Sequence, residues 1–108
     1  MLPKKNRVDT KNIKLIFKDG KFTTSPSLTF KFISTGSKNP PRISFIAPKS
    51  ISKLAVKRNK LRRKGYQAMH KFINQFPPGI LGAFIFKKPE DDILILENEI
   101  ENILRKIN

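Results

Sequence analysis

Apolar and polar residues recur along the chain with two different periods, and each period predicts a type of element. Residues 21–34 alternate between apolar and polar positions, as a half-buried strand does. Ser25-Pro26 interrupts this segment, which allows a break into two strands there. A further strand is predicted at 42–47, and a short, mainly apolar one at 81–87.

Three other segments have the 3.6-residue period of amphipathic helices. The first covers residues 10–19. The longest covers residues 52–76, with Ser50 or Ser52 as its N-cap. The last starts from the acidic stretch Pro89–Asp92, which complements the positive end of the helix dipole.

The helix predicted at 52–76 has three separate faces when each residue turns it by 100°. Its apolar face, which we expect in the core, carries Leu54, Leu61, Gly65, Ala68, Met69 and Phe72. A second face carries Arg58, Asn59, Arg62, Arg63, Tyr66 and His70. A third carries Lys57, Lys60, Lys64 and Lys71. The basic faces are therefore separate from the core stripe, as an exposed binding helix requires.

The order of elements predicts the architecture. Helices that pack on one small sheet give an α+β fold, or a two-layer α/β sandwich. The chain of 108 residues suits a single domain. We expect residues 1–8 to be a flexible, basic N-terminus.

The charge is large and unevenly distributed. The chain carries +15, and six of its eight carboxylates lie between residues 90 and 101. The 70 residues from 20 to 89 hold 15 Lys and Arg and no carboxylate. Such a stretch repels itself. A bound polyanion compensates the positive charge, and its phosphates release their counterions when Lys and Arg neutralise them. Nucleic acid is the leading partner, an anionic membrane is the alternative, and a solvated face is the neutral explanation.

Composition also excludes several kinds of chemistry. Because the chain has no cysteine, it has no disulfide, thiolate metal site or cysteine nucleophile. The absence of cysteine suits a reducing compartment, and we expect a cytoplasmic protein. His70 stands alone, so no metal site and no catalytic residue is predicted in this chain. No apolar run reaches the roughly 18 residues of a membrane span, and the start of the chain lacks the apolar stretch of a signal peptide.

The densest basic segment has a chemistry of its own. Seven of the twelve residues from Lys53 to Lys64 are basic. Arg58 and Arg62 lie one helical turn apart, so their planar guanidinium groups can hold successive phosphates. Asn59 lies between them and offers a donor and an acceptor. This combination suits a folded RNA better than a lipid surface.

The order of residues in this segment resembles a known family. Ala55-Val56-x-Arg58-Asn59-Lys60-x-Arg62-Arg63 is similar to the RNR signature of the bacterial ribonuclease P protein subunit, usually A-V-x-R-N-R-x-K-R. Lys60 and Arg62 exchange the usual Arg and Lys and keep the charge. The resemblance covers nearly the whole chain and includes Leu2, Arg7, Phe17, Gly20-Lys21, Arg42-Ile43, Lys49 and Ile85-Phe86-Lys87-Lys88-Pro89.

The resemblance implies a fold and a mechanism. The family has a four-stranded sheet with a long basic helix and a left-handed βαβ crossover. Its RNA subunit is the catalyst and removes the 5′ leader of precursor tRNA with Mg²⁺ held by RNA. The protein assists by binding the catalytic RNA and the single-stranded leader. The resemblance therefore implies that this chain has no catalytic residue and binds no cofactor alone. It also implies no membrane as a partner and no required protein partner.

The resemblance also implies which residues act. The basic helix would contact the RNA subunit through Lys53, Lys57, Arg58, Asn59, Lys60, Arg62 and Arg63. A cleft between the first helix, the sheet and the main helix would hold the leader, with Phe17, Phe30, Phe32 and Tyr66 as candidate contacts. For each Phe, core packing is the competing explanation, and Phe30 and Phe32 share one strand face.

Three other functions are compatible with the charge map. A different small RNA-binding protein, such as a ribosomal protein, would share the basic helix. A basic protein that coats a membrane or the nucleoid would show little preference for one structured RNA. A nuclease that acts alone would cleave without an RNA subunit.

Overall fold

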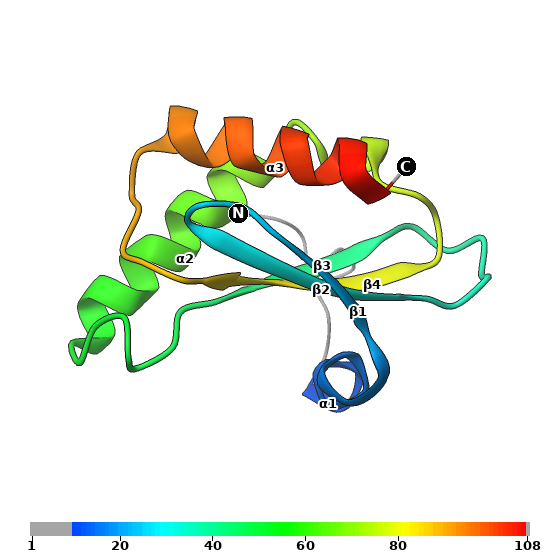
Figure 1. Cartoon of the computed structure of the whole chain (residues 1–108), viewed down its shortest axis with the longest axis horizontal. Coiled ribbons are helices and arrows are strands. Elements are labelled where there is room, and N and C mark those ends of the chain that lie inside the picture. The colour runs from blue at the N-terminus through cyan, green and yellow to red at the C-terminus, as the bar shows by residue number, and fades with distance from the viewer. Residues whose placement is uncertain (1–9, 108) are drawn as a thin grey trace.

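The computed structural model describes residues 10–107, so the basic segment expected at 1–8 lies outside the described residues. The elements follow in the order α1 (Thr10–Asp19), β1 (Lys21–Thr24), β2 (Leu28–Ser34), β3 (Arg42–Ile46), α2 (Ala55–Met69), the 3₁₀ turn η2 (Ile73–Gln75), β4 (Ile80–Phe86) and α3 (Ile93–Ile107). The α+β class and the four-stranded sheet are both confirmed (Figure 1).

The sheet has the strand order β1-β2-β4-β3. β1 and β2 form the hairpin that the break at Ser25-Pro26 allowed, and the backbone N–H of Ser25 donates to the carbonyl of Leu28 at 2.8 Å. β4 lies antiparallel to β2 and parallel to β3. Because β3 and β4 are parallel neighbours, the chain between them crosses over, and α2 lies in that crossover.

The register of the strands separates the two faces of the sheet. Phe30 pairs with Phe84, and Phe45 pairs with the same Phe84, so all three rings point to the face that α2 and α3 cover. The Phe30 and Phe84 ring centroids are 4.4 Å apart, and those of Phe45 and Phe84 are 5.0 Å apart. α1 lies across the opposite face and contacts β2 and β4 (Figure 1).

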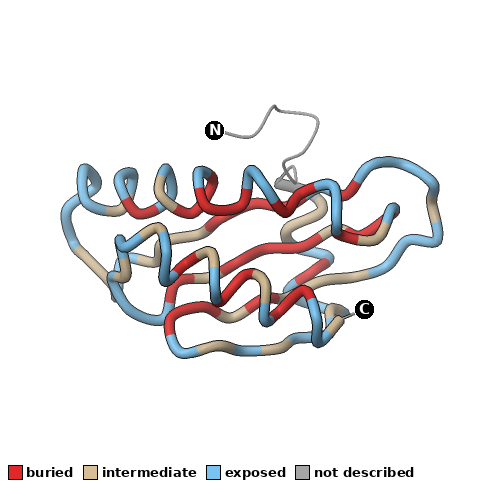
Figure 2. Tube along the Cα trace, turned by 90° about the horizontal axis from the view of Figure 1, so that it is seen from above, coloured by how far each residue is buried: buried red, intermediate tan, exposed pale blue. Residues whose placement is uncertain are grey.

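The core lies between the sheet and the α2–α3 layer, where Figure 2 shows the buried positions gathered. α3 contributes the apolar stripe that its period predicted, with Leu96, Ile100, Ile103 and Leu104 buried. Gly82 is required beneath Phe30, because an added Cβ would overlap the Phe30 ring. Close packing of this kind fixes the positions of the helices on the sheet.

The main helix is shorter than the predicted 52–76. α2 begins at Ala55, and its N-cap is Leu54, which has no side-chain cap hydrogen bond, so the prediction of a Ser50 or Ser52 cap was wrong. Leu54 is 58% exposed rather than part of the core. After Met69 the chain tightens into η2, because Phe72, Ile73 and Phe76 are all buried and the chain must turn there to reach β4.

One buried carboxylate ties α3 to the β1–β2 turn. Glu99 is 5% exposed, and its Oε1 accepts hydrogen bonds from the Ser25 hydroxyl and, at 2.7 Å, from the Ser27 backbone N–H. Ser27 N–H lies at a turn where no strand partner is available, so the carboxylate satisfies it. Glu99 is therefore a structural acid and not part of the acidic surface of α3.

We expect Glu99→Ala to lower the free energy of unfolding by about 1–3 kcal/mol, because it leaves a buried backbone N–H without its acceptor. Urea denaturation followed by circular dichroism measures this. Glu101→Ala is the matched control, since Glu101 forms only an exposed pair with Arg105 four residues later, worth about 0.5 kcal/mol or less. Equal losses from the two variants would contradict the structural role of Glu99.

Candidate nucleic-acid interface

α2 is held against the edge strand β3 by two local contacts. Gly65 faces the ring of Phe45 so closely that a Cβ there would overlap the ring. The next residue, Tyr66, accepts a hydrogen bond at its hydroxyl from the backbone N–H of Phe45, at 3.2 Å. This contact satisfies an edge-strand group that has no strand beside it. The rotation of α2 about its own axis is therefore fixed.

That rotation corrects the expected place of Tyr66. Its side chain is 7% exposed, and its ring packs edge-to-face on Phe45 with centroids 5.1 Å apart. Tyr66 thus belongs to the α2–β3 contact rather than to an exposed basic face. His70, the other ring predicted on that face, is exposed.

The basic side chains of α2, together with Asn59 and with Lys71 just after the helix, lie on two flanks. We call Arg58, Asn59, Arg62 and Arg63 the arginine flank, and Lys57, Lys60, Lys64 and Lys71 the lysine flank. Most of both sets is exposed, with Arg58 and Lys64 partly covered. The division follows from the helical period, which places Arg58 and Arg62 on the opposite side of the buried stripe from Lys60, Lys64 and Lys71.

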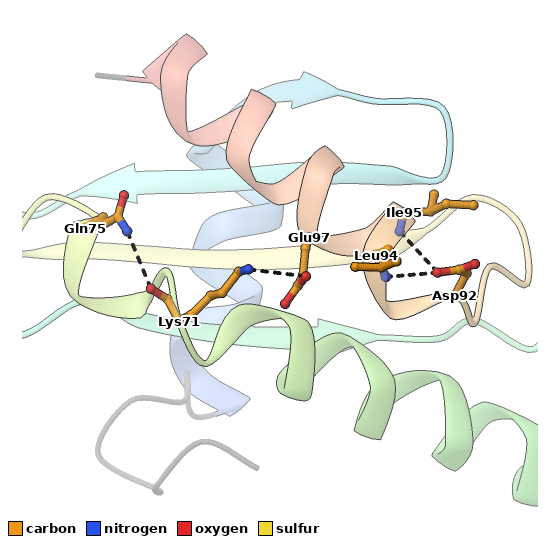
Figure 3. A network of polar contacts seen from close by, with 6 residues as sticks. All are labelled: Lys71, Gln75, Asp92, Leu94, Ile95 and Glu97. Atoms are coloured by element: carbon orange, nitrogen blue, oxygen red, sulfur yellow. Dashed lines mark hydrogen bonds and ion pairs between the residues drawn. The ribbon is translucent and has the colours of Figure 1, made fainter.

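The lysine flank faces carboxylates of α3 and of the segment just before it. Lys60 lies 3.8 Å from Asp91, which precedes α3. Lys71 lies 3.4 Å from Glu97 of α3, as Figure 3 shows. Asp92 caps α3 nearby, accepting the Leu94 and Ile95 backbone N–H groups at 2.9 and 3.4 Å (Figure 3). The acidic stretch predicted to start the last helix therefore has two roles, because it caps α3 and offsets the charge of the lysine flank.

The arginine flank has no such compensation. Among residues 10–107, no carboxylate forms an ion pair with Arg58, Arg62 or Arg63. Arg62 donates to the side-chain carbonyl of Asn59, one turn earlier, which orients both groups. The result is an exposed row of guanidinium and amide groups, the donors that bind phosphates and RNA base edges.

Arg58 also has a structural task. Its guanidinium donates to the backbone carbonyls of Ser52 and Lys53, at 2.9 and 3.0 Å. These bonds hold the segment before α2 at the helix start, where no side chain caps the helix. Lys53 itself is exposed beside this start. Six of the seven expected basic-helix residues are therefore on the surface. Arg58 is partly covered and also holds the segment before α2 in place.

A second exposed feature lies on the face of the sheet that α1 covers, which we call the α1 face. Phe17 of α1 is 43% exposed, and the Lys31 ammonium lies over its ring, 5.0 Å from the centroid. Lys31 pairs with Phe22 of β1, which is 67% exposed. Ile46 and Ile85, neighbours in the parallel pair, are only partly covered on the same face. The α1 face thus presents exposed aromatic rings, partly covered apolar side chains and a cation.

Of the four rings predicted to line one cleft, the structure places only Phe17 on the α1 face. Phe30 is fully buried among Phe32, Phe76 and Phe84. Phe32 shares its strand face and lies on the α2–α3 side, partly buried, with its ring stacked 5.3 Å from that of Phe30. Phe30 is therefore a core residue, and neither Phe30 nor Tyr66 has a ring face that is free to contact a ligand.

Sequence reasoning missed Lys31 and Phe22. The signal was present, because alternation along β2 puts Lys31 opposite to Phe30 and Phe32. Which of those two faces is the core depends on where the helices pack, which alternation alone leaves open.

In residues 10–107 no group of three or more His, Cys, Asp or Glu side chains lies together in a way that could hold a metal ion. No helix in that range is both long and apolar enough to cross a membrane.

Comparison with known proteins gives this geometry a context. No curated protein sequence matches the chain. Among solved structures, it is similar to the RNase P protein of Thermotoga maritima, with a TM-score of 0.80 and 22% identity over 94% of this chain and 97% of that one. It is also similar to the RNase P protein of Staphylococcus aureus, with a TM-score of 0.79 and 17% identity over 95% of each chain. At these identities the likeness establishes the fold.

The family model described as Ribonuclease P matches residues 2–108. This range includes both the arginine flank and the α1 face. It also contains the segment whose order of residues resembled the RNR signature. The chain therefore belongs to the ribonuclease P protein family.

Proposed function

We propose that this chain is the protein subunit of a ribonucleoprotein ribonuclease P, which removes the 5′ leader of precursor tRNA. The arginine flank binds the catalytic RNA, and the α1 face binds the single-stranded leader. The RNA performs the hydrolysis with Mg²⁺ that it holds itself. The observation that carries the proposal is the uncompensated arginine flank, set apart from a lysine flank that α3 partly neutralises.

The arginine flank suits a folded RNA for a geometric reason. Asn59 and Arg62 are already bonded to each other, so little side-chain entropy is lost when the pair meets a phosphate. Guanidinium groups one turn apart match phosphates in succession. Family membership supports association with an RNA subunit.

The α1 face suits a strand that differs from one precursor to the next. An aromatic face stacks any base, at about 1–3 kcal/mol per base, with little preference for sequence. Lys31 lies over Phe17 and is placed to meet a phosphate beside a stacked base. Phe17 therefore stays among the leader contacts that we propose, and Phe22 and Lys31 replace Phe30, Phe32 and Tyr66.

The direct test adds the protein to a bacterial ribonuclease P RNA with precursor tRNA at near-physiological Mg²⁺. We expect faster leader removal than with RNA alone, because the protein adds contacts to the leader, and no cleavage by the protein alone. The measurement is single-turnover cleavage of end-labelled precursor. An unchanged rate and substrate affinity would point instead to another structured-RNA-binding protein, and cleavage without RNA would contradict the assignment of catalysis.

A second test compares the two flanks of α2. Arg62→Gln with Arg63→Gln should weaken binding to the RNA subunit and lower the slope of log affinity against log salt by about 1–2, the loss of one or two phosphate contacts. Lys57→Gln with Lys60→Gln removes the same charge from the lysine flank and should have a smaller effect. Filter binding across a salt series measures both. Equal effects would show that net charge, not the flank, determines binding.

A third test concerns the leader. Phe17→Ala should weaken binding of leader-bearing precursor to the holoenzyme by about 1 kcal/mol, toward the low end for a stacked base because the ring is only partly exposed. Mature tRNA, which lacks a leader, should bind unchanged.

Leu15→Ala is the matched control, because Leu15 is also 43% exposed on α1 but lies on its other flank. Equilibrium binding of both RNAs to both variants decides the matter. A loss shared by mature tRNA, or by Leu15→Ala, would mean that Phe17 supports α1 rather than the leader.

A further inference from the structure

The loop between β2 and β3 lies at the end of the sheet away from the start of α2 (Figure 1). A polar pocket lies between this loop and α1. We call it the sheet-end pocket. Its volume is about 340 Å³. Its polar lining comes from α1, from the β2–β3 loop and from the start of β3, and consists of Asn12, Thr35, Ser37, Asn39 and Arg42.

The wall of this pocket is built by a chain of hydrogen bonds. The Thr35 hydroxyl donates to the Gly79 carbonyl at 2.7 Å and accepts from the Ser37 backbone N–H at 3.2 Å. The Ser37 hydroxyl accepts from the Asn39 N–H at 3.0 Å, and the Asn39 carbonyl accepts from the Gly79 N–H at 2.8 Å. The loop is therefore held in one shape.

Gly79 makes that shape attainable. Its φ is +80°, a conformation that side chains disfavour, and a Cβ there would overlap the Ser37 carbonyl. The backbone at Gly79 can thus lie close behind the loop, and its N–H can donate to the Asn39 carbonyl. A wall fixed in this way presents its side chains without first having to order them.

The lining has the chemistry of a phosphate site. Arg42 is exposed, and no described residue accepts a hydrogen bond from its guanidinium or forms an ion pair with it. Amide and hydroxyl groups surround it, and no carboxylate lines the pocket. A planar guanidinium beside neutral donors is the arrangement that binds phosphate oxygens in two places at once.

Two other pockets among residues 10–107, of comparable or larger size, fit an anion less well. One, of about 310 Å³ between α2 and the segments that precede α2 and α3, contains Asp91, which repels phosphate. The other, of about 580 Å³, lies by the β1–β2 turn. Its lysines Lys87 and Lys106 already donate to the carbonyls of Ser25 and Thr24. Of these three pockets, only the sheet-end pocket has both a guanidinium without a partner among the described residues and a lining without a carboxylate.

We infer that the sheet-end pocket binds a backbone phosphate of RNA, with Arg42 as the charged contact and Asn39 as a neutral one. The RNA identity rests on the proposed function, but anion binding by the pocket does not. The pocket lies on the Asn12 side of α1, while Phe17 and Lys31 lie on the other side, so this contact is separate from the leader contacts. Together with the arginine flank it holds the protein at two ends, which fixes its orientation on RNA.

The first experiment uses the protein alone with inorganic phosphate at constant ionic strength. Titration should shift the amide resonances of Ser37, Asn39 and Gly79, and Arg42→Gln should weaken the association about five- to tenfold, as expected for losing a charge-assisted hydrogen bond. Lys38→Gln is the control, because it removes the same charge from the neighbouring exposed loop without lining the pocket.

Asn39→Ala provides a second variant that keeps the backbone bonds of the loop and should also weaken the association. Equal affinities for Arg42→Gln and Lys38→Gln, or no shifts at the three amides, would overturn the inference. This result is independent of whether the protein activates a ribozyme, so its failure and that of the proposed function can be told apart.

The second experiment identifies the strand that supplies the phosphate. Arg42→Gln and Lys38→Gln are compared for binding to the RNA subunit, and for binding of precursor with long and short leaders to the holoenzyme. A loss specific to Arg42→Gln in the first comparison assigns the phosphate to the RNA subunit, and one that appears only with long leaders assigns it to the leader. No loss specific to Arg42→Gln in either would refute an RNA phosphate as the ligand.

Discussion

The constraint on which this structure depends is electrostatic self-repulsion. A chain of 108 residues with a charge of +15 has to keep its cations apart in the folded state. The fold does so by directing them outward on both flanks of α2, and Glu97 of α3 and Asp91 just before that helix supply carboxylates to only one flank. The other flank keeps its charge, and that charge is available to RNA.

The apolar part of the fold makes this arrangement possible. Phe84 lies at the centre of the sheet and contacts Phe30, Phe45 and Phe76, which come from three different parts of the chain. Because these rings fill one side of the sheet, the opposite side needs only a short helix to cover it. α1 has ten residues and leaves Ile46 and Ile85 partly exposed. The α1 face is thus open as a direct result of how the core is packed.

Glycines and buried polar groups position the functional surfaces. Gly65 lets α2 approach Phe45, and Tyr66 then caps the edge of β3, so the arginine flank points away from α3. Glu99 fixes the β1–β2 turn, and with it the hairpin that carries Phe22 and Lys31. Each of these two surfaces is therefore positioned by residues that do not themselves contact RNA in our proposal.

The sequence by itself determined the order of elements, the break at Ser25-Pro26, the apolar stripe of α3 and the family, because periodicity, turn residues and the RNR-like segment are local properties. It also separated the arginine and lysine flanks, since both follow from one helical period. Only the tertiary structure decided where α2 ends, because the burial of Phe72, Ile73 and Phe76 ends the helix at Met69 although their spacing continues the helical pattern.

The tertiary structure also decided which rings are free. Alternation along β2 assigned Phe30 and Phe32 to one face and Lys31 to the other, but which face is the core depends on helices distant in sequence. The same holds for Tyr66, which the helical period places on the face of Arg58 and Arg62 but which the structure packs against Phe45. Periodicity is set by neighbours along the chain, whereas burial is set by neighbours in space, and the second cannot be read from the first.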